Sequence, residues 1–221
     1  MKSRGRPRQY DRDHALRRAQ ARFWRKGYSA TSLDDLSDVT DMNKPSLYAA
    51  FGNKRTLYLL TLDDYARGSV AAIQLSLDRA TPLREGLRRL YDTAIRTYAP
   101  GAGPSRGCYL LATALTESLS DPAVRTKLAE ALRAFERELS SRFEAAKRDG
   151  ELPASADPAA LALLASAMLH TLAVRARAGE SRQTLESIAA TALAMLCPPA
   201  TSASPLRARG PARKAVERRV K

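Results

Sequence analysis

This sequence has little that would cross-link the chain. Only two of its 221 residues are cysteines, Cys108 and Cys197, and they lie far apart in unlike contexts. A disulfide framework is therefore excluded as the basis of the fold. Aromatic residues are also scarce, at 6%, and no internal repeat of solenoid length is visible. The hydrophobic share of 44% nevertheless excludes an intrinsically disordered chain and is enough for a real core.

Long uninterrupted apolar runs are missing as well. The most apolar stretch, Pro158 to Val174, contains Ser166, His170 and Thr171. It falls short of the roughly 20 apolar residues that a membrane-spanning helix needs. The N-terminal segment MKSRGRPRQYDRD is charged but has no apolar segment behind it, so we expect no secretory signal. These absences predict a cytoplasmic protein without a membrane span.

Acidic residues are too few to balance the basic ones. The 37 Lys and Arg residues exceed the 23 Asp and Glu residues, for a formal net charge of +14. Residues 1–60 hold 13 basic and 6 acidic residues, residues 200–221 hold 7 and 1, and residues 61–199 hold 17 and 16. A nearly neutral body with two basic ends points to a polyanionic partner, either nucleic acid or an acidic membrane surface.

Alternating strand patterns and β-branched runs are absent too. Apolar residues recur three and four positions apart, which predicts amphipathic helices and an all-α fold. Capping and breaking residues predict nine helices. The first ends at Gly27, the second is capped by Thr31 or Ser32, the third runs from Asn43 to Gly52, the fourth from Asn53 towards Leu75, the fifth from Pro82, the sixth from Cys108 to about Leu119, the seventh from Asp121 to Asp149, the eighth from Asp157 to Gly179, and the ninth from Ser181.

The segment from Gly27 to Lys54 carries the clearest functional signal. It reads GYSATSLDDLSDVTDMNKPSLYAAFGNK and predicts two short helices joined by a tight turn at about Thr40–Met42, after a longer first helix. This is the layout of a three-helix DNA-binding head, in which the second helix braces the third helix and the third enters the major groove.

Residue types in this segment and in the arm before it suit contacts with DNA. Hydroxyl and amide side chains at helix starts, beside free backbone amides, suit phosphate oxygens. Small side chains let the third helix approach base edges, and a basic arm suits the narrow minor groove. We expect Tyr48 to face DNA and Phe51 to lie in the core. The predicted DNA-binding residues are Arg4, Arg6, Arg8, Thr31, Ser32, Asn43, Lys44, Pro45, Ser46, Tyr48, Ala49, Asn53 and Lys54.

This region resembles the N-terminal domain of TetR/AcrR-family transcriptional repressors. The resemblance is strong over residues 12–60 and is carried by Phe23, Gly27-Tyr28, Thr31-Ser32-Leu33, Leu36, Lys44-Pro45-Ser46-Leu47-Tyr48, Phe51 and Lys54. The segment Arg106–Leu110 resembles an element that recurs in one branch of the family.

Four positions depart from the family pattern. Asp41 stands where the turn often has Gly, and Asp tolerates the left-handed conformation better than most residues. Ser37 and Thr40 replace small Ala residues, and Ala49 replaces a common His after the recognition Tyr.

The resemblance implies a homodimer built from the last two long helices and a small-molecule pocket inside the helical body. Small, flat faces on the eighth and ninth helices suit contact across a two-fold axis. The predicted interface residues are Ala162, Ser166, Leu169, Ala173, Leu185, Ile188, Ala189 and Ala192. The predicted pocket residues are Tyr91, Tyr98, Cys108, Leu111, Leu115, Phe135 and Met168; each of them is also a candidate for simple core packing.

These expectations define a domain order and a function. We expect a flexible basic arm over residues 1–11, a helix-turn-helix domain over 12–58, a ligand-binding and dimerisation domain over 59–197, and a disordered basic tail over 198–221. The predicted function is a repressor that binds a palindromic DNA operator as a homodimer and is released by an unidentified small-molecule inducer, with no cofactor and no membrane partner. The fourth helix, about 30 Å long, would transmit the signal.

Three alternatives remain open. Cys108, at the start of a predicted helix and near Arg106, is a candidate thiolate and hence a redox or electrophile switch, although a lone Cys on an apolar helix also packs as a hydrophobe. A non-specific architectural DNA-binding protein would use the same basic ends. An enzyme is not expected, because His14 and His170 have no partner spacing for a metal or a triad.

Overall fold

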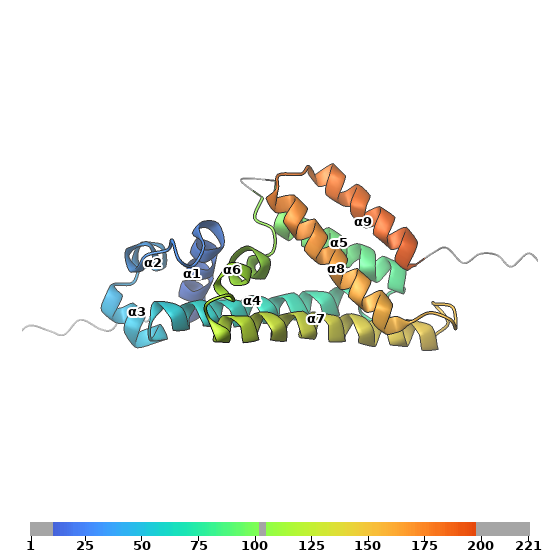
Figure 1. Cartoon of the computed structure of the whole chain (residues 1–221), viewed down its shortest axis with the longest axis horizontal. Coiled ribbons are helices and arrows are strands. Elements are labelled where there is room, and N and C mark those ends of the chain that lie inside the picture. The colour runs from blue at the N-terminus through green and yellow to red at the C-terminus, as the bar shows by residue number, and fades with distance from the viewer. Residues whose placement is uncertain (1–10, 102–104, 198–221) are drawn as a thin grey trace, which may run out of the picture.

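A computed structural model describes residues 11–101 and 105–197 of the chain and is helical throughout these ranges, which confirms the all-α prediction (Figure 1). The basic arm with Arg4, Arg6 and Arg8, residues 102–104 and the basic tail lie outside the described residues. The helices are α1 (Arg12–Lys26), α2 (Leu33–Thr40), α3 (Lys44–Phe51), α4 (Lys54–Ser76), α5 (Leu83–Tyr98), α6 (Leu115–Glu117), α7 (Pro122–Arg148), α8 (Pro158–Arg177) and α9 (Arg182–Leu196), and a π-helical turn, η1 (Leu110–Ala114), precedes α6.

Local capping sets the ends of the three N-terminal helices, which we call the head (α1–α3). Ser32, and not Thr31, is the N-cap of α2, and it forms a capping box with Asp35. Asn43 caps α3 by accepting a hydrogen bond from the Ser46 amide. Asp41 closes α2 with φ of 55°, in the left-handed region, as its tolerance of that conformation predicts.

Two long helices form the spine of the molecule. Figure 1 shows α4 and α7 running side by side, with the head at one end and α5, α8 and α9 stacked over the other end. With 23 residues at about 1.5 Å each, α4 is roughly 35 Å long and reaches from the head deep into the body. α4 therefore contacts both the head and the helical body.

α8 is the central helix of the body and packs against α5, α7 and α9. By length and composition alone it is long and apolar enough to cross a membrane, so the expectation that this stretch falls short is wrong. Its most apolar window has a mean hydropathy of 1.6 and is 39% buried. The packing makes α8 a core helix of this fold, with an apolar face left exposed.

The predicted sixth helix differs from the prediction. Instead of one helix to Leu119, the chain forms the π-helical turn η1 and then the short α6. Thr113 donates its hydroxyl to the Tyr109 carbonyl at 3.0 Å, the acceptor that an α-helical amide at position 113 would use. A side-chain hydroxyl therefore competes with the backbone ladder, and such π turns occur frequently at functional sites.

Candidate nucleic-acid interface and effector cavity

α3 presents one face to solvent and buries the other. Leu47 and Phe51, four residues apart, are each 3% exposed and anchor the helix in the core of the head. Tyr48 is 48% exposed, and Lys44, Pro45 and Ala49 are exposed beside it. The exposed side chains are thus those predicted to read DNA, and the aromatic pair divides between surface and core as expected.

The helix starts hold most of the other predicted contacts. Ser32, Asn43 and Asn53 are exposed, and each caps its helix by accepting an amide hydrogen bond. Ser46 is half-buried. Thr31 is 1% exposed and donates its hydroxyl to the Gly27 carbonyl at 2.6 Å, so its predicted phosphate contact is wrong.

The two lysines of the interface differ in their surroundings. Lys44 pairs with Asp34 at 2.6 Å, and both side chains remain largely exposed. This pair is weak in water and leaves the ammonium group available to a phosphate. The Lys54 ammonium lies over the Tyr28 ring, 4.4 Å from its centroid, and burial lowers its pKa. Lys54 therefore contributes to the packing of the head as well as to its positive surface.

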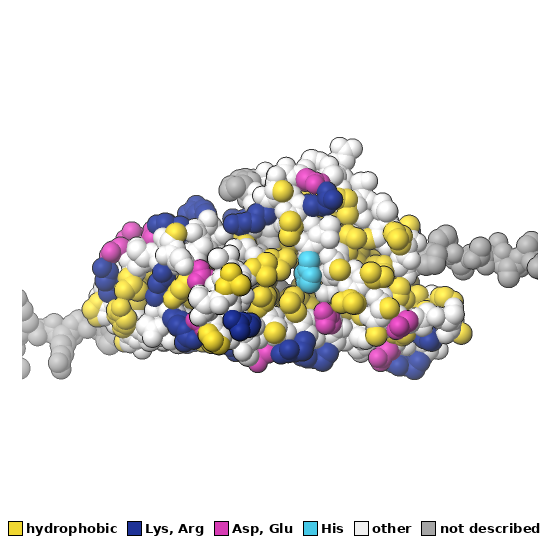
Figure 2. Space-filling view, in the orientation of Figure 1, with side chains coloured by type: hydrophobic (Ala, Val, Ile, Leu, Met, Phe, Trp, Pro, Cys, Tyr) yellow, Lys and Arg dark blue, Asp and Glu magenta, His cyan; other side chains and the backbone are white. Residues whose placement is uncertain are grey.

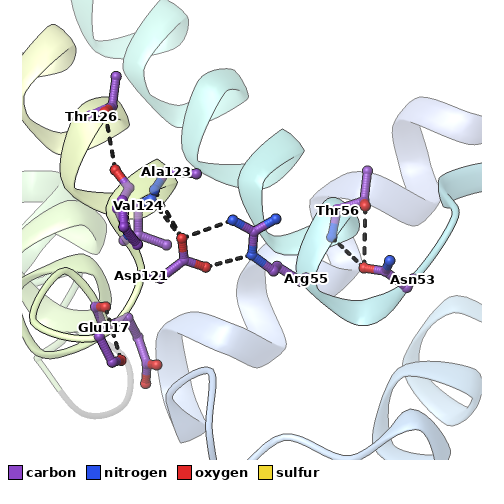
Figure 3. Close-up of polar contacts among 10 residues, drawn as sticks. Asn53, Arg55, Thr56, Glu117, Asp121, Ala123, Val124 and Thr126 are labelled. Carbon is purple, nitrogen blue, oxygen red and sulfur yellow. Dashed lines mark hydrogen bonds and ion pairs between the residues drawn. The ribbon is translucent and has the colours of Figure 1, made fainter.

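A bidentate ion pair joins the first turn of α4 to the start of α7 (Figure 3). Arg55 donates from Nε and Nη2 to the two carboxylate oxygens of Asp121, at 2.5 and 2.8 Å. The Arg55 guanidinium, together with backbone amides of α7, lowers the pKa of Asp121 to about 2. Ser29, in the segment between α1 and α2, links the head to the body by donating to Glu117 at 2.8 Å. No local pattern signals contacts between residues so far apart in sequence.

The Arg106-Gly107 element is a second joint between head and body. The indole of Trp24 on α1 and the guanidinium of Arg177 on α8 both donate to the Arg106 carbonyl, each at 3.2 Å. Gly107 follows with φ of +64°, and a Cβ there would lie 2.6 Å from the Ala173 carbonyl oxygen of α8. Only glycine allows the chain to pass so close to α8 in this conformation.

A cavity of about 330 Å³ lies where α1 meets the body. Of the predicted pocket residues, Tyr98, Cys108, Leu111 and Phe135 line it. Helices α1, α4, α5, α7 and α8 and the segment containing η1 all contribute to its wall; further lining residues include Arg17, Gln20, Asp64, Tyr65, Ile73, Leu90, Thr93, Leu132, Leu169 and His170. In Figure 2, hydrophobic side chains gather over the middle of this face, with a histidine among them.

Three predicted pocket residues lie elsewhere. Tyr91 is fully buried, donates to the Ala165 carbonyl at 3.3 Å and borders a separate hollow between α5 and α9. Leu115 is 50% exposed, and Met168 packs against the core without lining this cavity. Helical periodicity places these side chains on the correct helices but does not give the rotation of each helix relative to the others.

Sequence reasoning missed the contributions of Arg17 and Gln20. Both lie on α1 of the head, yet they line the cavity. His170 also lines the cavity, and no hydrogen bond to it occurs among the described residues. Burial lowers its pKa, which favours the neutral imidazole. Only the docking of α1 and α8 reveals these roles.

Of the two alternatives for Cys108, the structure favours packing as a small hydrophobe over a thiolate. Its side chain is 7% exposed, and burial raises its pKa. The Tyr65 hydroxyl donates to Sγ at 3.5 Å and opposes this shift only in part. The desolvation cost of a charged sulfur in this apolar wall exceeds the helix-end and guanidinium effects assumed from the sequence.

The predicted dimer residues lie inside the single chain. Seven of them, all except the half-buried Ile188, are buried, because they pack α8 and α9 against the rest of the body. Other sides of the same helices carry exposed large apolar side chains, three on α8 and one on α9. Leu163 and Leu164 are each 58% exposed, Val174 is 59% exposed and Met195 is 78% exposed. We call these four residues the α8–α9 face.

Within the described residues, no three His, Cys, Asp or Glu side chains converge as a metal site would require. The exposed α3, held by a capped α2 and a left-handed turn, makes the head a helix-turn-helix DNA-binding domain.

Comparison with known proteins identifies the family. Residues 15–61 match the model described as "Bacterial regulatory proteins, tetR family", and residues 84–192 match "Tetracyclin repressor-like, C-terminal domain". The chain is 34% identical over 194 residues to the HTH-type transcriptional repressor ComR of Escherichia coli (strain K12), covering 87% of this chain and 91% of ComR.

Two further relatives agree. The HTH-type transcriptional repressor BdcR of the same organism is 34% identical over 107 residues, covering 48% of this chain and 54% of BdcR. A cysteine mutant of the TetR-family regulator CifR, solved with 26bp double-strand operator DNA, superposes with a TM-score of 0.77 at 34% identity, covering 85% of this chain and 98% of CifR. The present chain belongs to the TetR family of DNA-binding transcriptional regulators.

Proposed function

We propose that this protein is a cytoplasmic repressor that binds a palindromic operator as a homodimer, with α3 of each protomer in the major groove. The exposure of Lys44, Tyr48 and Ala49 on one face of α3 carries this proposal, because these side chains can reach base edges and phosphates without unfolding anything. The structure of the CifR mutant supports this proposal, because that related protein was solved in complex with operator DNA.

The homodimer forms through the α8–α9 face. Exposed leucine, valine and methionine side chains on two adjacent helices make an apolar surface of the kind that marks a protein interface. A two-fold axis through this face would bring four helices together and set the spacing of the two heads. Two half-sites about 34 Å apart, or a small multiple of that distance, would then be read together.

A small molecule in the cavity releases the DNA. The cavity wall includes α1 of the head and the middle of α4, so an occupant contacts the DNA-binding unit and the transmitting helix together. A hundredfold loss of operator affinity requires about 2.7 kcal/mol of difference in ligand affinity between the two states, which one pocket can supply. The raised pKa of Cys108 favours such reversible binding over the alternative of a thiol switch.

The test is operator selection from random DNA, followed by binding measurements on the selected site. Tyr48→Ala and Lys44→Ala are each expected to weaken operator binding by about 1–3 kcal/mol while the melting temperature stays unchanged. Arg133→Ala removes an equal charge from an exposed position on α7 that has no ion pair among the described residues, and it serves as the matched control. Binding by the Tyr48, Lys44 double variant at full strength would refute the role of α3.

A further inference from the structure

We propose that the ligand of this cavity is a compact, uncharged and mostly apolar molecule with one hydrogen-bond acceptor, such as a carbonyl or ether oxygen, and that the Tyr98 hydroxyl donates to that acceptor. The proposal rests on the cavity's being the effector site of the proposed function and adds the chemical class of the effector. The size of the cavity, the polar groups in its wall and the charge states of those groups each support the proposal.

The volume of the cavity limits the size of the ligand. About 330 Å³ lies at the lower end of the range for small-molecule pockets, so the occupant is compact. Apolar side chains from α4, α5, α7 and α8, among them Ile73, Leu90, Leu132 and Phe135, make up much of the wall. Burying hydrocarbon against such a wall is favourable, whereas a strongly hydrated ligand would lose its hydration there without equivalent hydrogen bonds.

Tyr98 supplies an unused donor. Its side chain is 8% exposed and lines the cavity, and none of the described residues forms a hydrogen bond with its hydroxyl. The Tyr98 residue is itself held in place, because its carbonyl accepts hydrogen bonds from the amides of Arg106 and Gly107 at 2.8 and 3.2 Å. Because Tyr98 lies in the cavity wall, a ligand acceptor inside the cavity could take the hydrogen bond of its hydroxyl in place of water.

The other titratable groups on the wall explain why the ligand is uncharged. Burial raises the pKa of Tyr65, Tyr98 and Cys108 and lowers that of His170, so all four are neutral near pH 7. Arg17 is exposed at the lining, and Asp64 is half-buried and already paired with Arg67 at 3.0 Å. A charged ligand would therefore lose its hydration without gaining a buried counter-charge.

The test is a titration of the full-length, DNA-free protein with cyclooctanone, cyclooctane and cyclooctanecarboxylate. Trp24, the one tryptophan of the chain, reports binding by fluorescence because its ring packs edge-on against Tyr65, 5.4 Å between centroids, and Tyr65 lines the cavity. The ketone is expected to bind at least tenfold more tightly than the carboxylate.

Two variants separate the hydrogen bond from packing. Tyr98→Phe keeps the ring and is expected to weaken ketone binding about three- to tenfold while leaving cyclooctane binding unchanged. Tyr91→Phe on the same helix removes a hydroxyl that already donates to Ala165 outside the cavity, and it is expected to change neither affinity.

Three outcomes would overturn the proposal: tighter binding of the carboxylate than of the ketone, equal ketone affinity in Tyr98→Phe and the parent, or no response to any of the three probes. Because no DNA is present, these outcomes leave operator binding untouched. Failure to select an operator would refute the proposed function without altering the titration.

Discussion

Lys44, Tyr48 and Ala49 lie on the exposed side of an eight-residue helix whose inward residues, Leu47 and Phe51, fill the core of the head. This division could be predicted from the sequence, because the positions of buried and exposed side chains in so short a helix follow from its period. Thr31 could not be assigned in the same way. Either Thr31 or Ser32 suits an N-cap, and only the folded chain shows the Thr31 hydroxyl bound to Gly27.

Cys108 provides a test of burial at the residue scale. Iodoacetamide reacts with the thiolate, and the raised pKa of Cys108 keeps the thiol protonated at neutral pH. In a Cys197→Ser background, the alkylation rate of the folded protein is therefore expected to rise with pH and to be still rising above pH ~8.5, the pKa of an ordinary thiol. A rate that levels off below pH ~8 would contradict this assignment and restore the thiolate sensor.

At the scale of elements, helix ends were predictable and helix contacts were not. Ser32, Asn43, Asn53, Asp121 and Asp157 all cap the helices expected from their local sequence. The interruption in the sixth predicted helix does not follow from local sequence, because it involves the Thr113 hydroxyl and hydrogen bonds between this segment and the distant residues Tyr58 and Thr61. The rotation of α8, which decides what faces the cavity, also depends on packing with three other helices.

The Arg55–Asp121 pair is expected to hold the first turn of α4 in place. Asp121→Asn keeps an N-cap oxygen for α7 but removes the charge that binds Arg55. Hydrogen exchange at residues 53–58 should therefore accelerate, while the loss of stability stays near the 0.2–1 kcal/mol of an exposed ion pair.

Asp157→Asn is the matched control for this pair. Asp157 caps α8 in the same way but has no ion pair among the described residues. If both variants leave exchange in the first turn of α4 at the parent rate, the link between α4 and α7 has no effect on the head.

Gly107 is expected to be the least replaceable glycine described. Gly107→Ala would place a Cβ 2.6 Å from the Ala173 carbonyl oxygen and in a left-handed conformation. We expect the free energy of unfolding in urea to fall by about 2–4 kcal/mol. Gly179→Ala has positive φ but open space, so a loss of only about 1–2 kcal/mol is expected. Equal losses in the two variants would show that the close approach to α8 costs nothing.

At the scale of the whole molecule, the interface residues predicted from the sequence are mostly buried within one protomer. Small residues such as Ala162 and Ala173 suit any close helix contact, and the fold uses them within one protomer. The large apolar side chains of the α8–α9 face remain exposed, and we propose that a second protomer covers them. Sequence periodicity cannot distinguish the two uses, because α8 is apolar on nearly every side.

The α8–α9 face is expected to control the oligomeric state. Leu164→Glu would place a charge in the centre of the apolar interface, so the protein should elute with the mass of one 24.1 kDa chain instead of two in light scattering. Leu119→Glu, at a site that is 81% exposed near the start of α7, should remain dimeric. A Leu164→Glu protein that keeps twice the chain mass would place the interface elsewhere.

We infer that this chain reads a DNA sequence, whereas an architectural protein would coat DNA through its basic ends. The most direct measurement is the ratio of dissociation constants for the selected palindrome and a scrambled duplex of equal length, at about 0.15 M salt, where non-specific contacts weaken. We expect the scrambled duplex to have a dissociation constant about 10³ times that of the palindrome or more, with a smaller ratio in Tyr48→Ala. A ratio near one, unchanged in Tyr48→Ala, would contradict it and identify an architectural DNA-binding protein.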